Sequence, residues 1–314
     1  MTERVRVLFL AGMGRSGTTL IERVLAAAPG AVGLGELTHV WKRGLLQNER
    51  CGCGLPFSEC PFWQRVGVDA FGGWGSVDVA EVLRLRSRVD KVRHVPGLLL
   101  PSAALRRDRD SYGDRYAAVY RAAARLSGAS VVIDSSKQAS LPHVLAGRAD
   151  VDLCVVHCVR DARAVCFAWT KRVARPDCWR GESYMDRYAP RTTAARWIAH
   201  NTAIELLRRQ GVPVLRLRYE DLLADPVGRF AALARFAGLP PDQASLPHLT
   251  AEAADLPLAH TVSGNPLRFT VGRVPLRRDD AWRSAMPIGQ RRLVTSMTWP
   301  LLMRYGYPAL VRSS

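Results

Sequence analysis

The first thirty residues constrain the fold more than any other part of the chain. Val5–Leu10 is a nearly continuous apolar run, long enough for a buried strand and too short for a helix. A glycine-rich stretch follows at residues 12–17, and apolar residues then recur at helical spacing until Pro29-Gly30. A strand, a glycine-rich turn and a helix N-terminus together present backbone N–H groups suited to a phosphate or sulfate. This pattern predicts an α/β domain with an anion site at its first turn.

The turn differs from an ATP-binding loop at one position. Gly12–Thr19 satisfies G-x-x-x-x-G, but Thr18 stands where the lysine of such a loop belongs. Without that lysine the loop is poorly equipped to hold a triphosphate, although it can hold a 5′-phosphate, and Arg15 adds a guanidinium fork. The alternative is an ordinary tight turn, which we disfavour because Arg-Ser-Gly-Thr-Thr is far more specific than a glycine cluster.

The stretch GMGRSGTTLIERVL, residues 12–25, resembles the 5′-phosphosulfate-binding loop of sulfotransferases. These enzymes use 3′-phosphoadenosine-5′-phosphosulfate (PAPS), and the bacterial and tyrosylprotein types carry Arg-Ser-Gly-Thr-Thr. The resemblance implies that Arg15 also stabilises charge on the transferred group. It further implies that the donor is bound by Gly14, Arg15, Ser16, Gly17, Thr18 and Thr19.

Composition is that of a globular protein with an excess of positive charge. Hydrophobic residues make up 48% of the 314 residues, and 45 basic residues against 28 acidic ones give a net charge of +17. The excess fits a polyanionic ligand or an acidic acceptor. Because the arginines are scattered, without a basic tail or a basic–aromatic repeat, we do not expect a nucleic-acid partner.

The sequence favours a cytoplasmic protein without a membrane span. Residues 1–4 lead directly into the first strand, without a secretory signal. Apolar stretches such as Val95–Leu105 are broken by prolines and are too short to cross a bilayer. Seven cysteines, an odd number, do not suggest a secreted disulfide framework.

Polar side chains follow three further predicted strands. Val131–Ile133 leads to Lys137, Val151–Val159 to Arg160, and Val212–Leu217 to Tyr219. Ligands bind at the carboxyl ends of parallel strands, so these residues should meet at one sheet edge. The resemblance implies that Lys137 contacts the phosphosulfate, that Arg160 binds the 3′-phosphate and that Tyr219 lies near the adenine. Two serines before Lys137, at positions 135 and 136, either contact the sulfuryl group or cap the next helix.

Two more arginines are predicted to bind the donor. The resembling motif has a serine eight residues after Arg160, where this chain has Ala168. Arg172, four residues further on and therefore on the same helical face, can compensate. The resemblance implies that a basic loop preceding Trp282 closes over the 3′-phosphate, with Arg268 as the preferred contact.

The general base is predicted to be Glu36. It stands at the end of the short apolar run in Ala31–Leu37, where an isolated acid would more often be a solvated surface residue. The resemblance implies that a Gly-Glu at this distance from the loop accepts the proton of the acceptor hydroxyl. Should Glu36 fail, His39 and His143 are the candidate replacements, because both lie near proposed active-site segments.

Three cysteines form the most unusual stretch. Cys51, Cys53 and Cys60 could bind zinc if a fourth ligand, such as His39 or Cys178, came from elsewhere. No second C-x-x-C pair accompanies them. We therefore favour buried thiols or a redox-sensitive local disulfide, and expect no metal to be required.

These patterns predict an α/β fold with a P-loop-like, three-layer parallel sheet of four or five strands flanked by helices. A single domain spans residues 1–314, with a helical, cysteine-containing insertion over about 38–128. The predicted activity is sulfuryl transfer from PAPS to a hydroxyl or amine of a small-molecule, glycan or peptide acceptor. A P-loop kinase and a non-catalytic nucleotide-binding protein on the same scaffold remain as alternatives.

Overall fold

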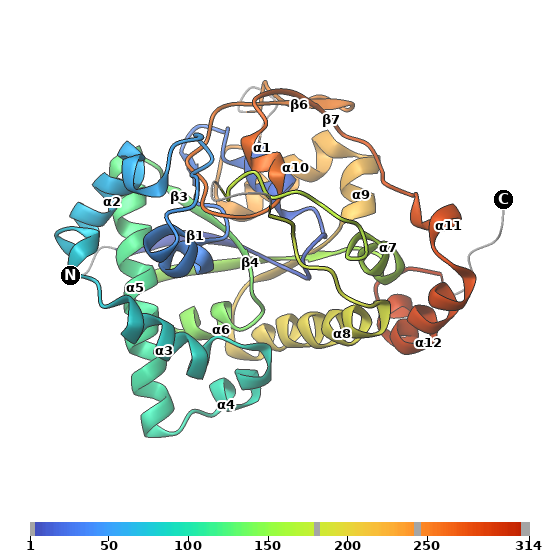
Figure 1. Cartoon of the computed structure of the whole chain (residues 1–314), viewed down its shortest axis with the longest axis horizontal. Coiled ribbons are helices and arrows are strands. Elements are labelled where there is room, and N and C mark those ends of the chain that lie inside the picture. The colour runs from blue at the N-terminus through green and yellow to red at the C-terminus, as the bar shows by residue number, and fades with distance from the viewer. Residues whose placement is uncertain (1–3, 179–182, 242–245, 309–314) are drawn as a thin grey trace.

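A five-stranded parallel sheet forms the centre of the molecule (Figure 1). The computed structural model describes residues 4–178, 183–241 and 246–308. All four strand pairings in the sheet are parallel. The predicted fold class is therefore confirmed. In spatial order the strands are β2 (Ala31–Gly33), β3 (Val131–Lys137), β1 (Val5–Ala11), β4 (Val151–Val159) and β5 (Val214–Arg218).

β1 lies at the middle of the sheet and is buried on both faces. Val7 and Phe9 belong to one hydrophobic core, whereas Leu8 and Leu10 belong to the other. This explains why the strand reads as a continuous apolar run instead of an alternating one. The first core is completed by α5 (Ala103–Ser127), α6 (Leu141–Leu145) and α8 (Pro190–Leu206), and the second by α1 (Thr18–Leu25), α9 (Tyr219–Ala224) and α10 (Pro226–Ala237), as Figure 1 shows.

The predicted insertion contains one helix that covers the sheet. α5 begins at Ala103, and Ser102 caps it by accepting a hydrogen bond from the Leu105 N–H. Tyr112, Tyr116 and Tyr120 recur every four residues and are fully buried in the core that β1 and β3 share. The other elements of the insertion are α2 (Pro61–Phe71), α3 (Val79–Val89), α4 (Val95–Leu99) and short helical turns at 37–39, 40–46, 57–59, 74–76 and 92–94. The single-domain assignment stays a prediction.

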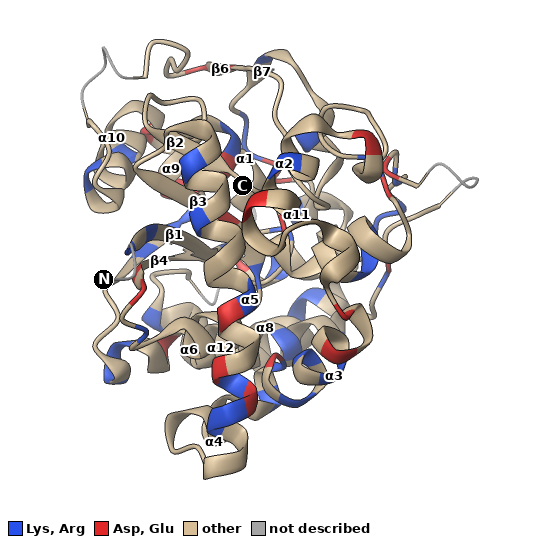
Figure 2. Cartoon of the chain, turned by 90° about the vertical axis from the view of Figure 1, so that its left-hand side faces the viewer, with Lys and Arg blue, Asp and Glu red and all other residues tan. Residues whose placement is uncertain are grey.

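The C-terminal part packs against the end of the sheet near α7 (Ala162–Ala168) and α8. Val294 and Leu302 of α12 (Ile288–Arg304) and Trp282 of α11 (Trp282–Ala285) lie in the same core. No helix within the described ranges is long and apolar enough to cross a membrane. In Figure 2 the basic residues are spread over many elements with acidic residues among them. The remaining elements are a 3₁₀ turn at Leu207–Gln210, another at Pro266–Phe269, and the antiparallel pair β6 (Ala253–Leu256) and β7 (Gly272–Pro275).

Candidate active site

The loop between β1 and α1 is shaped by close packing against aromatic rings. Gly17 has a φ of 86°, and a Cβ there would lie 2.3 Å from the Tyr219 ring. A Cβ at Gly14 would lie 2.7 Å from Trp169, whose Nε1 donates to the Gly14 carbonyl oxygen at 3.0 Å. Arg15 also adopts the left-handed region, with a φ of 77°, which is costly for a residue other than glycine. The loop is thus held in one strained, preorganised shape.

Buried polar atoms of this loop are left without partners. Ser16 Oγ, Thr18 Oγ1 and Arg15 Nε are buried and make no hydrogen bond within the described structure. Each such atom costs about 1–3 kcal/mol unless it is satisfied. Oxygens of a phosphate or phosphosulfate group would accept from all three. These residues therefore fit the anionic end of the predicted donor.

Lys137 reaches Glu36 across the carboxyl edge of the sheet. Its ammonium donates to Glu36 Oε1, and His39 Nε2 lies 3.4 Å from Glu36 Oε2. The register between β1 and β3 shifts just before Lys137, whose φ is 66°. Such a bulge turns a side chain away from its regular direction. The structure thus joins the two residues that the sequence predicted as base and cation.

The charge of Glu36 depends on these neighbours. Burial alone would raise its pKa, but the charge of Lys137 and the hydrogen bond from His39 outweigh burial and hold the pKa well below its usual range. Burial lowers the pKa of His39, so this imidazole is a neutral donor at pH 7. Glu36 is therefore an ionised carboxylate beside a cation, and its basicity is suppressed while the pair persists.

Arg160 joins the glycine-rich loop to the loop that precedes Trp282. Its guanidinium donates to the carbonyl oxygens of Arg15, at 3.0 Å, and Asp279, at 3.1 Å. The same guanidinium lies 5.0 Å from the centre of the Tyr219 ring. Arg15, Arg160 and Tyr219 therefore meet at one end of the site, as predicted.

One segment of the chain matches a known family. Residues 149–243, which include β4, Arg160 and Tyr219, match the model of a sulfotransferase family. No curated protein matches the chain.

Solved structures share its fold at low sequence identity. The sulfotransferase domain of the olefin synthase from Synechococcus PCC 7002 is 20% identical, with a TM-score of 0.52, over 98% of this chain and 97% of that one. The sulfotransferase domain from the curacin biosynthetic pathway is 15% identical, with a TM-score of 0.49, over 98% and 99% of the two chains. The first of these likenesses supports the P-loop-like α/β fold.

Arg172 does not lie where the sequence placed it. α7 ends at Ala168, so Arg172 is outside the helix and cannot share a helical face with Ala168. Its guanidinium stacks instead at 3.7 Å from the centre of the Tyr184 ring. The prediction of a common helical face was wrong because the helix spans only two turns. The segment after α7 does return to the site, where Arg15 Nη2 contacts Met185 Sδ at 3.1 Å.

The contacts of Arg268 are those of a residue with a structural role. The side chain is 1% exposed and donates to the carbonyl oxygens of Thr261, at 2.6 Å, and Arg50, at 2.5 Å. Asp177 lies 3.8 Å from the same guanidinium. These partners differ from those of Arg160, so the structure does not join Arg268 to the predicted 3′-phosphate site. Its guanidinium holds two loops together instead.

Of the two replacement bases, only His39 lies at the site. His143 is fully buried, and its ring nitrogens contact Gln210 and the Ala203 carbonyl oxygen. Ser135 and Ser136 lie within β3 and do not cap the next helix, α6, whose N-cap position is Ser140. Ser136 Oγ accepts instead from the Thr38 N–H at 2.9 Å.

Glu22 is a supporting residue that the sequence analysis missed. Its carboxylate accepts from the Gly35 N–H, at 2.5 Å, and from Ser135 Oγ, at 2.6 Å. Burial raises the pKa of Glu22 to about 7, and hydrogen bonds oppose that shift only in part. It thereby ties α1 to the backbone beside Glu36 and to the strand that carries Lys137. The sequence offered one indication of this role: Glu22 is a single acidic residue among the apolar residues of the first helix.

Proposed function

We propose that the protein transfers a sulfuryl group from PAPS to a hydroxyl or amine. The observation that carries this proposal is the buried Glu36–Lys137 ion pair beside the glycine-rich loop. A carboxylate can accept a proton from the acceptor, and an ammonium can stabilise negative charge on the donor. Both groups belong to a fold that sulfotransferases share.

The donor supplies the activated sulfuryl group, and the chain supplies a site that fits it. Residues Gly14–Thr19 would hold the phosphosulfate end, which is supported by the unpartnered Ser16 and Thr18 hydroxyls. Arg160 would bind the 3′-phosphate, and Tyr219 would lie beside the adenine. Arg160 is only 9% exposed, so a phosphate bound there would be partly desolvated and held strongly.

Lys137 links donor binding to the basicity of Glu36. An anionic donor at the loop would attract the Lys137 ammonium away from Glu36. Without that neighbouring charge, the pKa of Glu36 rises, because burial then opposes ionisation. Glu36 would thus become a stronger base when the donor is in place, with His39 still orienting its second oxygen. The cationic roles are filled by Arg15, Lys137 and backbone N–H groups, so this scheme requires no metal.

The test is transfer from isotope-labelled PAPS in a cell extract, with mass spectrometry of products that gain one sulfuryl group. The acceptor class, whether small molecule, glycan or peptide, is read from the labelled product. Lys137→Ala should remove the labelled product. Lys171→Ala is the matched control, since Lys171 is paired with Asp279 at 3.1 Å and should leave the product in place.

Other outcomes would replace the proposal. Magnesium-dependent phosphate transfer from ATP would support the kinase alternative. Tight binding of adenosine 3′,5′-bisphosphate without transfer to any acceptor would support a non-catalytic role, for which Ala168 in place of the usual serine is the motivating observation. The cytoplasmic location stays a prediction.

A further inference from the structure

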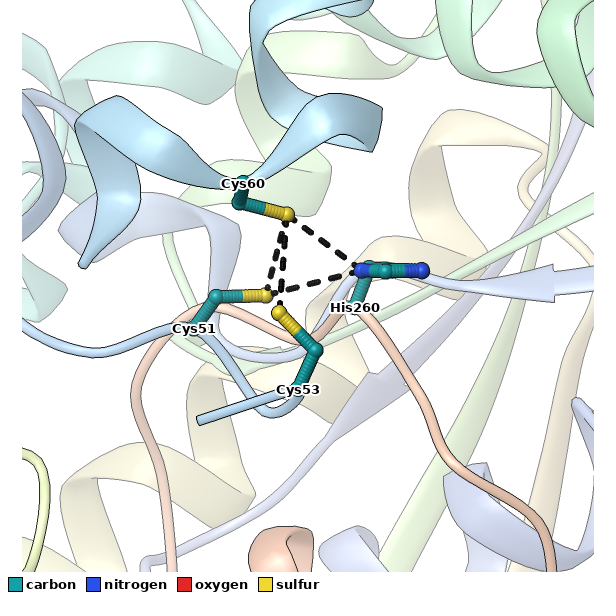
Figure 3. A group of neighbouring side chains, drawn as sticks. All are labelled: Cys51, Cys53, Cys60 and His260. Atoms are coloured by element: carbon teal, nitrogen blue, oxygen red, sulfur yellow. Dashed lines mark hydrogen bonds between the residues drawn. The ribbon is translucent and has the colours of Figure 1, made fainter. Parts of the chain in front are cut away.

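Four potential metal ligands converge from distant parts of the sequence (Figure 3). Cys51 and Cys53 come from one loop, Cys60 immediately precedes α2, and His260 comes from the segment after β6. The ligand atoms of all four lie within 4.8 Å of one another. Cys60 Sγ lies 3.5 Å from Cys51 Sγ, 3.8 Å from Cys53 Sγ and 3.3 Å from His260 Nδ1.

These distances match a tetrahedral metal site and not a disulfide. Zinc bonds of about 2.3 Å to sulfur and about 2.0 Å to nitrogen place two sulfurs about 3.8 Å apart, and a sulfur and a nitrogen about 3.5 Å apart. The observed sulfur–nitrogen separations, 3.3 and 3.9 Å, bracket the second value. A disulfide needs about 2.05 Å between its sulfurs, and all seven cysteines carry free thiols.

We propose that Cys51, Cys53, Cys60 and His260 bind one zinc ion in a closed structural site. Each thiol releases its proton to solvent, and the neutral imidazole binds through Nδ1, so the filled site carries one net negative charge. Three sulfurs and one imidazole form a ligand set typical of structural zinc. Since all four positions are filled by protein, no position remains for a substrate.

The surrounding backbone holds the ligands in place. The Gly52 N–H donates to the Thr261 carbonyl oxygen at 2.9 Å, and a Cβ at Gly52 would lie 2.5 Å from the Ala259 carbonyl oxygen. Only glycine therefore allows the cysteine loop to approach the segment that carries His260. A metal ion would add to a contact that the backbone already makes.

Aromatic residues fix the histidine. The His260 ring stacks on Phe62, with centroids 5.4 Å apart and planes 17° apart, and Trp63 Nε1 donates to the His260 carbonyl oxygen at 2.9 Å. Cys53 and His260 are partly exposed, whereas Cys51 and Cys60 are buried. The ligands are thus oriented by their neighbours, and the exposed side gives the ion a path of entry.

This arrangement corrects the sequence-based reading of the cysteines. Zinc was disfavoured there because no second C-x-x-C pair accompanies the three cysteines, and the fourth ligands suggested were His39 and Cys178. In the structure His39 contacts Glu36, and the group of four contains neither residue. The fourth ligand, His260, lies 200 residues from Cys60 along the chain.

The site lies next to the backbone that holds Glu36. Val262, two residues after His260, accepts from the Glu36 N–H at 2.7 Å and donates to the Leu34 carbonyl oxygen at 2.8 Å. A zinc ion would therefore fasten the insertion to the segment that positions Glu36. The inference rests on the ligand geometry alone and does not depend on the donor or the acceptor.

The direct test is the metal content of the full chain, purified under reducing conditions with zinc present. Elemental analysis should find about one zinc per chain, and less than about a tenth of that in Cys53→Ser and His260→Ala. Cys178→Ser is the matched control, because this partly exposed cysteine is outside the group, and it should keep its zinc. A folded wild-type chain without zinc, or variants that retain it, would overturn the proposal.

A second measurement does not require the variants to fold. The wild-type chain loaded with Co²⁺ should show the strong visible bands of tetrahedral cobalt, together with thiolate-to-cobalt charge-transfer absorption. Weak octahedral bands would overturn the proposal. So would a Cys51–Cys60 disulfide found by mass spectrometry in protein kept under reducing conditions.

Discussion

At the scale of single residues, the site is defined by charges that neutralise one another. Glu36 and Lys137 have side chains that are 12% and 16% exposed, so their attraction is weakly screened by solvent. The ion pair suppresses the basicity of the carboxylate, because the charge of Lys137 lowers the pKa of Glu36. Catalysis by Glu36 therefore requires that another anion compete for Lys137.

Glu36→Gln tests the predicted base. Glutamine keeps the shape and can accept the Lys137 hydrogen bond, but it cannot take up a proton. Single-turnover transfer from saturating PAPS should slow by about 10²–10⁴-fold. Affinity for adenosine 3′,5′-bisphosphate should stay level or rise, because Glu36 is placed on the acceptor side and the loss of its charge frees Lys137 for an anion at the loop. Transfer within about threefold of the parent rate would exclude Glu36 as the base and make His39 the next residue to test.

Arg160→Ala tests the predicted 3′-phosphate contact. Loss of a charge-assisted hydrogen bond costs about 1.5–3 kcal/mol, so binding of adenosine 3′,5′-bisphosphate should weaken by about tenfold or more. Adenosine 5′-phosphate should lose much less affinity, and it controls for disturbance of the Arg15 and Asp279 carbonyl contacts. Equal losses for both nucleotides in calorimetry would remove Arg160 from the 3′-phosphate site.

Glu22 should make stability depend on pH. Its pKa rises from an ordinary 4.5 to about 7 on folding, mainly through burial. Between these values the folded state binds one more proton than the unfolded state. The free energy of unfolding should therefore fall as the pH rises from 4.5 to about 7, by about 3 kcal/mol in total, and then level off.

Glu22→Gln isolates this contribution. The amide oxygen can accept from the Gly35 N–H, and the amide nitrogen can donate to Ser135 Oγ, so the packing is preserved. Urea unfolding of both proteins at several pH values should give curves that diverge as the pH rises from 4.5 to about 7, with the parent losing more stability. Burial also raises the pKa of Asp134, to about 6. Asp134 is present in both proteins, but its charge is one of the causes that raise the pKa of Glu22, so the divergence of the curves reports Glu22 together with this coupling. Parallel curves would mean that Glu22 titrates normally in the folded chain.

At the scale of elements, the turn into α1 combines backbone strain with crowding. Gly17→Ala should cost about 1–2 kcal/mol for the left-handed backbone alone, and more because the Tyr219 ring must move. Gly128→Ala is the matched control: Gly128 has a φ of 64° after α5, with nothing within 4 Å of an added Cβ. Both variants should lose stability in urea, but only Gly17→Ala should weaken nucleotide binding. Equal effects on binding would contradict the role of the turn.

The elements that could be predicted from sequence are those with a local signal. Apolar runs located β1, β3 and β4, and polar residues at their ends placed Lys137 and Arg160 at one edge. Local pattern could not show the bulge in β3 that directs Lys137 towards Glu36. Arg172 was misplaced because helical spacing says where a face lies but not where the helix ends, and α7 stops at Ala168.

At the scale of the whole molecule, the unpredicted features are contacts between distant segments. The sequence around Arg268 does not distinguish an arginine that binds a ligand from a buried arginine that holds loops together. Its partners Arg50 and Asp177 come from other parts of the chain. His260 is equally unmarked, since neighbouring residues supply no second ligand. Such roles follow only from the folded arrangement of the insertion against the segment after β6.

Removal of the proposed zinc should loosen this long-range connection without unfolding the sheet. A chelator should accelerate hydrogen exchange at the Gly52, Val262 and Glu36 amides, whose bonds join the cysteine loop to the His260 segment and that segment to the active site. The acceleration should reach about tenfold or more, because these bonds would open locally. The Val155 amide, bonded to the Pro213 carbonyl oxygen at the junction of β4 and β5, is the internal control and should not change. Equal acceleration at these three amides and at Val155 would mean that zinc supports the whole fold. No change at any of them would mean that the metal does not support the backbone that positions Glu36.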